Sequence, residues 1–415
     1  MKKSLISILV VLMVITLVLS PVVLAKTRIT IWWPQGENES AVLKSAIEDF
    51  SKEYPEIEIV PEWQGQANYQ DKFQISFVGG KGPDIVRLDH IWVQSFGYKK
   101  MLLDLNQFGV NEIKDKYFQG AWQANLYQDQ VFALPFDANT IALMYNQELL
   151  NETATEVPTN LEELIAAAKQ NTRDTDGDGQ IDLWGYTIPN APKNSGWMQF
   201  QFLFWVWRNG GEVLNQDWTE AVYNSKEAVE ALQLLKDIGY KHKVAPVSAY
   251  YEDDFYNGGV AFLDMGCWHM GKITEEGRPF AYALLPELKP EIGSVSGLGL
   301  YSLAINSASK NPEAAYHFIK FLSASKKYQI MWAHKTNLLP SLKDGFDHHY
   351  FQTKDWQVFK EQIEHVKTRP GTPAWPEIQE HMSVAIQKVL LNKATPQEAL
   401  DEAVAKSNKS LAKYK

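Results

Sequence analysis

The amino-acid sequence predicts an α/β protein, because segments typical of strands and helices alternate along almost the whole chain. Residues 28–32 alternate in polarity and are rich in strand-forming residues. A helical stretch with apolar residues on one face follows and ends at Pro55, and residues 57–60 have the composition of a second strand. A strand, a helix and a strand in this order predict a parallel sheet with crossover helices.

Later segments continue the alternation. A glycine-rich turn at residues 79–83 leads into a short apolar strand at residues 84–88. Thr159 and Glu162 have the spacing of a capping box, which predicts a helix over residues 161–169. The chain shows no internal repeat and no low-complexity linker, so a chain with two lobes would cross between them more than once.

The first 25 residues have the layout of a secretory signal peptide. Lys2 and Lys3 precede an apolar run over residues 5–19, and small or apolar residues stand before a cleavage site after Ala25. The run is short for a membrane span and no stop-transfer segment follows, although an uncleaved anchor is the alternative. No cysteine lies near the site to accept a lipid. We expect a periplasmic or secreted protein that is not inserted in the membrane after cleavage.

Size and charge narrow the class of protein. The 390 residues left after cleavage are too many for one core and suit two lobes. Loss of Lys2 and Lys3 takes the net charge from −10 to −12, which argues against nucleic acid or an anionic membrane surface as a partner. A single cysteine, Cys267, excludes an internal disulfide. The 14 tryptophans suggest that some indole rings lie on a surface where they can contact a ligand. As a separate expectation, the protein is a monomer.

Enzyme signatures are absent from the sequence. It has no H-E-x-x-H, G-x-S-x-G or G-x-G-x-x-G motif. Residues 266–272 approach a phosphate-binding loop, but Ile273 stands where a metal-binding Ser or Thr is required. No histidine partner for Cys267 can be identified. A secreted carbohydrate-active enzyme remains an alternative, because carboxylates beside exposed indoles suit a glycoside hydrolase.

One motif predicts a metal ion. Residues 174–182 place carboxylates at loop positions 1, 3, 5 and 9 and a glycine at position 6, as in the first part of a calcium loop. Gly185 occupies position 12, where such loops carry a glutamate, so an acidic turn without metal is the alternative. The expected ligands of a structural Ca²⁺ are Asp174, Asp176, Asp178, Gln180 and Asp182.

Several segments, taken in order, resemble family 1 extracellular solute-binding proteins, the sugar receptors of ABC importers, similar to maltose- and trehalose-binding proteins. The segments are 82–86 with 88–89, 133–146, 258–262 with 266–268, 297–306 with 311–315, 337–341, and 369–376. Each motif alone is loose, but the ordered set covers nearly the whole chain after the export signal.

The resemblance implies a two-lobed periplasmic-binding-protein fold of type II, in which hinged lobes close on a ligand. About three interlobe crossings are expected, near residues 136–139, 296–302 and 339–342. Residues 26–136 with 300–340 would form the N-terminal lobe, and residues 137–299 with 341–415 the C-terminal lobe.

Candidate ligand-binding residues follow partly from chemistry, since sugars need flat rings for their faces and planar polar groups for their edges. Of Trp32 and Trp33 at the end of the first strand, one should face the core, and we favour Trp33 as the ligand contact. Glu37 or Glu39 follows at the start of the first helix, where either could instead favour the helix dipole.

The other candidates come from the resemblance or from the expected crossings. Asp89 matches a hydroxyl-binding carboxylate of the family, Trp268 a stacking ring, Gly297 a site of close backbone approach or a hinge, and Arg369 a sugar-binding arginine of trehalose receptors. The remaining candidates are Trp92, Asp137, Asn139 and, more weakly, Trp375 and Trp205.

The function implied by the resemblance is capture of a mono- or oligosaccharide and its delivery to an ABC importer permease, without chemistry. A polyamine, a peptide or glycerol phosphate is the alternative ligand.

Overall fold

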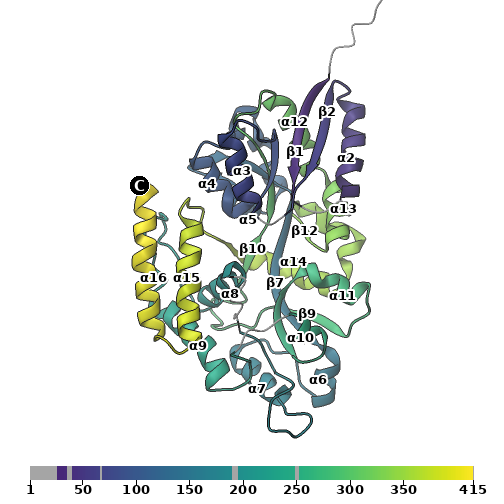
Figure 1. The fold of residues 1–415 in the computed structure, drawn as a ribbon. Helices are drawn as coiled ribbons and strands as arrows, with labels where there is room; N and C mark the ends of the chain where they lie inside the picture. The colour runs from purple at the N-terminus through teal and green to yellow at the C-terminus, as the bar shows by residue number, and fades with distance from the viewer. Residues whose placement is uncertain (1–25, 35–39, 66–67, 189–194, 248–251, 415) are drawn as a thin grey trace, which may run out of the picture.

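The computed structural model describes residues 26–34, 40–65, 68–188, 195–247 and 252–414, and they form two lobes that each contain a β-sheet (Figure 1). The first sheet has the order β2-β1-β3-β11-β6. Its strands are β1 (Thr27–Trp33), β2 (Ile57–Trp63), β3 (Ile85–Asp89), β6 (Ala133–Pro135) and β11 (Tyr301–Ile305). β1 pairs in parallel with β2 and β3, which confirms the parallel sheet predicted for the start of the chain.

Helices cover this sheet because each buries one apolar face. Helix α2 (Ser40–Glu53) connects β1 to β2 and buries Val42, Leu43, Ala46 and Phe50. The other helices of the N-terminal lobe are α3 (Tyr69–Val78), α4 (His90–Tyr98), α5 (Gln119–Gln123), α12 (Pro312–Ser323) and α13 (Lys326–Thr336). The short strands β4 (Leu126–Tyr127) and β5 (Gln130–Val131) form a separate hairpin.

The second sheet is built around the long strand β7 (Asp137–Asn146), which pairs with four other strands. Its neighbours are β8 (Phe262–Gly266), β9 (Phe280–Ala283), β10 (Ser296–Gly299) and β12 (Leu339–Pro340). All four run antiparallel to β7, and β13 (Val366–Thr368) lies parallel to β10.

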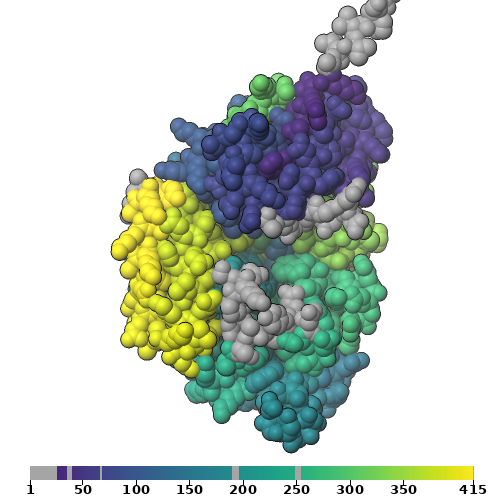
Figure 2. All heavy atoms as spheres, viewed as in Figure 1, coloured from purple at the N-terminus to yellow at the C-terminus, as the bar shows by residue number. Residues whose placement is uncertain are grey.

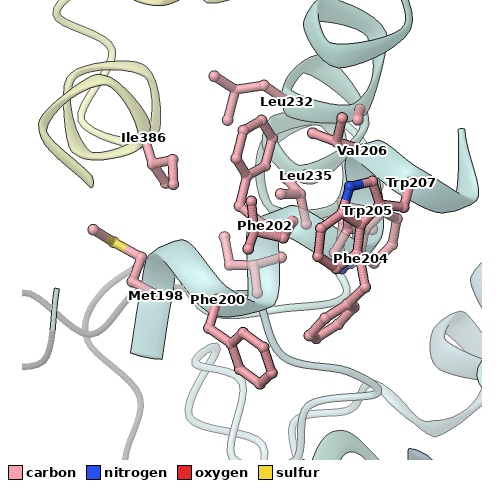
Figure 3. Packing of buried hydrophobic residues seen from close by; sticks show 14 of the residues in the cluster. Met198, Phe200, Phe202, Phe204, Trp205, Val206, Trp207, Leu232, Leu235 and Ile386 are labelled. Atoms are coloured by element: carbon pink, nitrogen blue, oxygen red, sulfur yellow. The ribbon is translucent and has the colours of Figure 1, made fainter. Parts of the chain in front are cut away.

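Helix α8 (Ser195–Arg208) lies at the centre of the C-terminal core (Figure 3). Its buried side chains include Phe202, Trp205 and Trp207, which contact helices α9 (Lys226–Tyr240) and α15 (Trp375–Leu390) through one apolar cluster. Trp205 is only 1% exposed, so it fills the core and is not a ligand contact. The remaining helices are α6 (Gln147–Thr153), α7 (Leu161–Asn171), α10 (Glu252–Tyr256), α11 (Met270–Thr274), α14 (Lys354–Gln362) and α16 (Pro396–Leu411).

The N-terminus of α7 differs by one residue from the predicted capping box. Asn160, not Thr159, is the N-cap, and its side chain accepts a hydrogen bond from the Glu163 amide at 3.0 Å. Glu163, not Glu162, reaches back to the amide and hydroxyl of Thr159 at 2.8 Å. The helix itself is present as predicted. The first backbone amides of a helix have no partner within it, and here Asn160 and Glu163 take the capping roles that were predicted for Thr159 and Glu162.

Within the described residues, the chain passes between the two sheets at three places. It crosses at Phe136 between β6 and β7, at Leu300 between β10 and β11, and between α13 and β12. The C-terminal helices α15 and α16 (yellow in Figure 2) lie along one side of the C-terminal lobe and reach the N-terminal lobe, where Tyr414 contacts Tyr98 with ring centroids 5.3 Å apart. None of the helices described here has both the length and the apolar character needed to span a bilayer.

Candidate ligand-binding site

An ion pair joins the two lobes at the edges of their sheets. Asp89 is the last residue of β3 and the N-cap of α4, and Arg369 directly follows β13 in the other sheet. Arg369 Nη2 lies 3.3 Å from Asp89 Oδ1. The fold therefore brings together two residues that are 280 positions apart in the sequence. Both were predicted from the sequence as ligand contacts.

Both side chains of the pair are charged, and one hydrogen-bond donor of Arg369 has no partner among the described residues. Burial raises the pKa of the Asp89 carboxyl, but the Arg369 charge and the hydrogen bond from His90 outweigh it and hold that pKa at about 2. The Arg369 side chain is only 10% exposed, and its Nε has no hydrogen-bond partner among the described residues. An arginine offers five N–H donors, and among the described residues Arg369 uses one of them on Asp89.

Aromatic rings of the C-terminal lobe continue from this pair. The Arg369 guanidinium lies over the ring of Phe200, 4.9 Å from its centroid. Trp197 contacts Phe200 at a centroid distance of 6.0 Å and Trp268 at 5.7 Å. Trp197 and Trp268 are half-buried, so each still presents part of its indole at the surface.

Trp268 lies directly over Gly266, the last residue of β8. A Cβ atom at position 266 would fall 2.0 Å from the Trp268 ring, so only glycine permits this placement. The ring therefore has one side against backbone and contacts the edge of Trp197 with an interplanar angle of 73°. Trp268 is half-buried next to Trp197, and its role as a stacking ring stays a prediction.

The N-terminal lobe contributes two half-buried rings, Trp92 and Tyr301. Tyr301 pairs with Asp89 across β11 and β3, and burial raises its pKa to about 12, so its hydroxyl stays protonated at neutral pH. Trp92 lies on α4 three residues after Asp89 and contacts Phe96 at a centroid distance of 5.7 Å. Flat rings beside a carboxylate and a guanidinium suit a ligand with apolar faces and hydroxyl edges.

The structure corrects the choice between Trp32 and Trp33. Trp33 is fully buried and contacts Phe136 and Trp332 edge-on, at centroid distances of 5.7 and 5.4 Å. Trp32 is the half-buried ring, and its Nε1 donates to Glu62 at 2.8 Å. Glu37 and Glu39 lie outside the described residues.

Asp137 is also placed differently from the prediction. It is buried at the start of β7, where Oδ2 accepts hydrogen bonds from Arg87 Nη2 at 2.5 Å and Trp332 Nε1 at 3.0 Å. Its Oδ1 accepts from the Tyr301 amide at 3.0 Å. With these partners inside the protein, the carboxylate holds crossing segments together and is not exposed to a ligand.

Two further candidates, Trp375 and Gly297, are enclosed by packing, and a third, Asn139, stays a prediction. Trp375 is fully buried in the C-terminal core, because it opens helix α15 on the face that packs against the lobe. At Gly297 a Cβ would fall 2.6 Å from the Phe200 ring, so the group that approaches this backbone closely is Phe200. Asn139 is half-buried and lies against Gly299, its partner across β7 and β10.

The sequence interpretation did not single out the half-buried rings of Trp197 and Tyr301, or Phe200, a core ring on which the Arg369 guanidinium lies. Periodicity cannot tell which ring of a mostly buried helix reaches its edge. Tyr301 follows the second crossing directly, which was a usable signal. Cys267 is fully buried, and burial raises the pKa of its thiol, so it is unsuited to act as a nucleophile.

The acidic loop at residues 174–182 brings three of its five predicted ligands together. Single side-chain oxygens of Asp174, Asp176 and Asp182 all lie within 4.8 Å of one another. Asp178 is not in this group, and its carboxylate accepts hydrogen bonds from Gln180 instead. Backbone amides of Gly179 and Gly177 donate to Asp174 and lower its pKa, so the carboxylate is charged at neutral pH.

Two α/β lobes joined by three crossings, with polar and aromatic side chains where they meet, define a receptor that binds a solute between its lobes. The chain belongs to the bacterial extracellular solute-binding protein family, whose model matches residues 45–387.

Relatives and solved structures agree with this assignment. The chain is 22% identical to a maltotriose-binding protein of Pyrococcus abyssi, over 91% of this chain and 80% of the relative. It is 23% identical to a galactooligosaccharide-binding protein of Bacillus subtilis, over 91% and 88%. An ABC transporter solute-binding protein of Thermotoga lettingae, solved with α-D-tagatose, superposes with a TM-score of 0.78 at 26% identity, over 93% of this chain and all of the other.

A further structure supports the fold alone. The cyclic α-maltosyl-1,6-maltose-binding protein of Arthrobacter globiformis has a TM-score of 0.83 at 21% identity, over 94% of this chain and 100% of that one.

We predict that Asp137→Asn lowers the free energy of unfolding by about 3–5 kcal/mol, because it leaves the Arg87 charge buried without its counterion. Chemical denaturation measures this loss. Asp344→Asn is the matched control, since it removes a carboxylate from an exposed ion pair with Lys326 and should cost about 1 kcal/mol or less.

The double variant Arg87→Met with Asp137→Asn removes both charges and should recover part of the loss. Similar small costs for Asp137→Asn and Asp344→Asn would contradict a structural role for the buried pair.

Proposed function

We propose that this chain is an extracytoplasmic receptor that binds a mono- or oligosaccharide between its lobes and delivers it to an ABC importer permease. The observation that carries the proposal is the Asp89–Arg369 ion pair between the lobes, from which a chain of ring contacts leads through Phe200 to the half-buried rings of Trp197 and Trp268. Rings bind the C–H faces of a sugar by excluding water, and the charged pair binds hydroxyl edges. One lobe supplies Asp89 and the other Arg369, so a ligand that contacts both favours the closed arrangement.

The named ligands of the relatives support this class of ligand. The Pyrococcus and Bacillus relatives are binding proteins for maltotriose and a galactooligosaccharide, and the Thermotoga structure contains a ketohexose. The phosphate of a glycerol phosphate carries about two negative charges, and the Arg369 charge is already paired with Asp89. A polyamine would be repelled by the same arginine. Neither alternative is favoured by an observation at this site.

The proposed receptor binds its ligand without converting it. A glycosidase acid must be protonated near neutral pH, which requires a raised pKa. The pKa of the Asp89 carboxyl group is lowered instead of raised, to about 2. The Asp137 carboxylate is buried in an ion pair with Arg87. Neither carboxyl group can therefore serve as the proton donor to a glycosidic oxygen.

We also propose export as a monomer, with residues 1–25 removed as a signal peptide after Ala25. The lobes would then comprise residues 26–136 with 300–340 and residues 137–299 with 341–415. The layout of the leader sequence and the extracellular family both support this. The mass of the chain recovered from outside the cytoplasm should correspond to a start at Lys26; a retained leader would indicate an anchor instead.

A structural Ca²⁺ at residues 174–182 is proposed on the grouping of Asp174, Asp176 and Asp182, with Asp178 and Gln180 as the other sequence candidates. Hard carboxylate oxygens on a loop with glycines at positive φ suit this ion. Its binding would fix a loop that the hydrogen bonds of Arg173 and Leu183 close at its base.

Trp268→Ala should weaken sugar binding roughly ten- to a hundredfold, since loss of a stacked ring removes about 1–3 kcal/mol. Calorimetry against a panel of mono- and oligosaccharides that includes maltotriose measures the loss. The ligand-free variant should retain most of its stability, whereas Trp375→Ala, the control for a core indole, should lose about 3–5 kcal/mol.

No binding by the wild-type protein to any sugar of the panel would overturn the ligand class. A large loss of ligand-free stability in Trp268→Ala with unchanged affinity would instead assign that ring to the core.

Removal of Ca²⁺ should lower the melting temperature, because an ion present at a hundred times its dissociation constant stabilises the native state by about 2.7 kcal/mol. Differential scanning fluorimetry with a chelator, followed by Ca²⁺ or Mg²⁺, tests this, and Ca²⁺ should restore more. Asp176→Asn should abolish the difference, whereas Asp115→Asn, an exposed acid outside the loop, should preserve it. If the melting temperature is unchanged by the chelator and elemental analysis finds no bound metal, the loop is an ordinary acidic turn.

A further inference from the structure

Apart from the site around Asp89 and Arg369, a pocket lies where the two lobes meet and is lined by residues of both. Its volume is about 230 Å³. Tyr127 and Gln128 from the hairpin of β4 and β5 form one wall. The other lining residues belong to the C-terminal lobe and are Asp217, Trp218, Thr219, Gly371, Thr372, Pro373, Leu411 and Tyr414.

Trp218 is held in this pocket in an unusual conformation. Its φ is +54°, in the left-handed region that a residue with a large side chain rarely adopts, and the residue is 42% exposed. Asn215 fixes the loop, because its Oδ1 accepts the amides of Thr219 at 2.8 Å and Glu220 at 3.0 Å. A strained backbone that presents an exposed indole on a rigid loop is a reason to look for a function of the ring.

The neighbouring loop is shaped around the Trp218 ring. A Cβ atom at position 371 would lie 2.7 Å from that ring and 2.5 Å from the Gln94 amide nitrogen of the other lobe. The segment after Arg369 therefore passes closely between Trp218 and α4, and a larger side chain at position 371 would require Trp218 or Gln94 to move. Since Arg369 is two residues away, at most about 7 Å of chain separates this loop from the main site.

Three tyrosines complete an aromatic corner across the lobe junction. Tyr98 lies edge-on to Tyr127 at 6.1 Å and to Tyr414 at 5.3 Å. Tyr98 and Tyr127 belong to the N-terminal lobe and Tyr414 to the C-terminal end of the chain. Trp218 and this corner place flat rings around the pocket, while Asp217, Thr219, Gln128 and Thr372 line it with polar groups.

We propose that this pocket is a second carbohydrate site, which takes one pyranose ring on the face of Trp218. The proposal rests on the proposed function for the class of ligand but not for the location. Its volume is below the roughly 300–1,000 Å³ of sites for drug-sized ligands, which suits a single ring. Its occupant contacts both lobes and so favours the closed arrangement.

The polar lining decides between ligand classes. No lysine or arginine lines the pocket among the residues described, so it does not suit an anion. A quaternary ammonium ion would favour aromatic faces and Asp217 but could not exchange hydrogen bonds with Thr219, Thr372 and Gln128. The side chains of these three residues contact Asn215, Ala374 and Tyr127, and each keeps further hydrogen-bonding capacity. A sugar can stack on the rings and add hydrogen bonds to these polar groups.

The test uses the mature chain labelled with 5-fluorotryptophan, whose Trp218 resonance is assigned by its absence in Trp218→Phe. The double variant Trp268→Ala with Arg369→Ala disables the main site. Methyl α-D-glucoside at millimolar concentration should still shift the Trp218 resonance in this variant. Trp218→Ala in the otherwise wild-type chain should leave high-affinity binding, measured by calorimetry, within about twofold.

The outcomes separate the two proposals. Main-site binding without any shift of the Trp218 resonance up to 100 mM sugar would overturn the second site and leave the receptor function standing. A Trp218 shift without main-site binding would support the second site and overturn the first. A shift with choline chloride but not with the sugar would overturn the carbohydrate assignment of the pocket.

Discussion

The Asp137 carboxylate connects the segments that must stay together for two lobes to act as one receptor. It begins the strand that crosses first and binds the amide of Tyr301, which begins the strand after the second crossing. It also binds Trp332 on α13, which precedes the third crossing. Its counterion Arg87 lies among the rings of Trp33, Tyr301 and Trp332, 4.2–5.0 Å from their centroids. Cation–π contacts and the ion pair compensate a charge that burial would otherwise make very costly.

This buried pair also fixes the geometry of the ligand site. Arg87 and Asp89 are two residues apart on β3, so they lie on the same face of the strand. Tyr301 lies over Arg87 and pairs with Asp89 across the sheet. The N-terminal half of the site is therefore built on strands that the hinge itself holds in place. Arg369 approaches from the other lobe, and its distance from Asp89 depends on how far the lobes are closed.

Local patterns predicted the fold well because they depend on periodicity and on ordered motifs. The site was harder, since choices between adjacent residues depend on tertiary contacts. Strand alternation shows that Trp32 and Trp33 face opposite ways but not which face the second layer covers. Asp137 stands out as polar in an apolar run, and that signal is the same for a ligand contact and for the counterion of a buried arginine 50 residues earlier. Asp89 and Arg369 were identified through the resemblance, and sequence reasoning could not have shown that they pair.

The tryptophan content illustrates the same limit. Six of the indoles, including Trp33 and Trp375, are among the largest fully buried side chains, so composition mainly reports two large cores. Trp197 and Trp268 remain half-buried and are linked to the Arg369 guanidinium through the ring of Phe200. The Arg369 and Asp89 side chains are only 10% and 24% exposed, so the cost of removing both charges from water offsets much of their attraction. A ligand that buries ring surface stabilises the closed arrangement without this cost, so we expect the ligand rather than the ion pair to set the closed population.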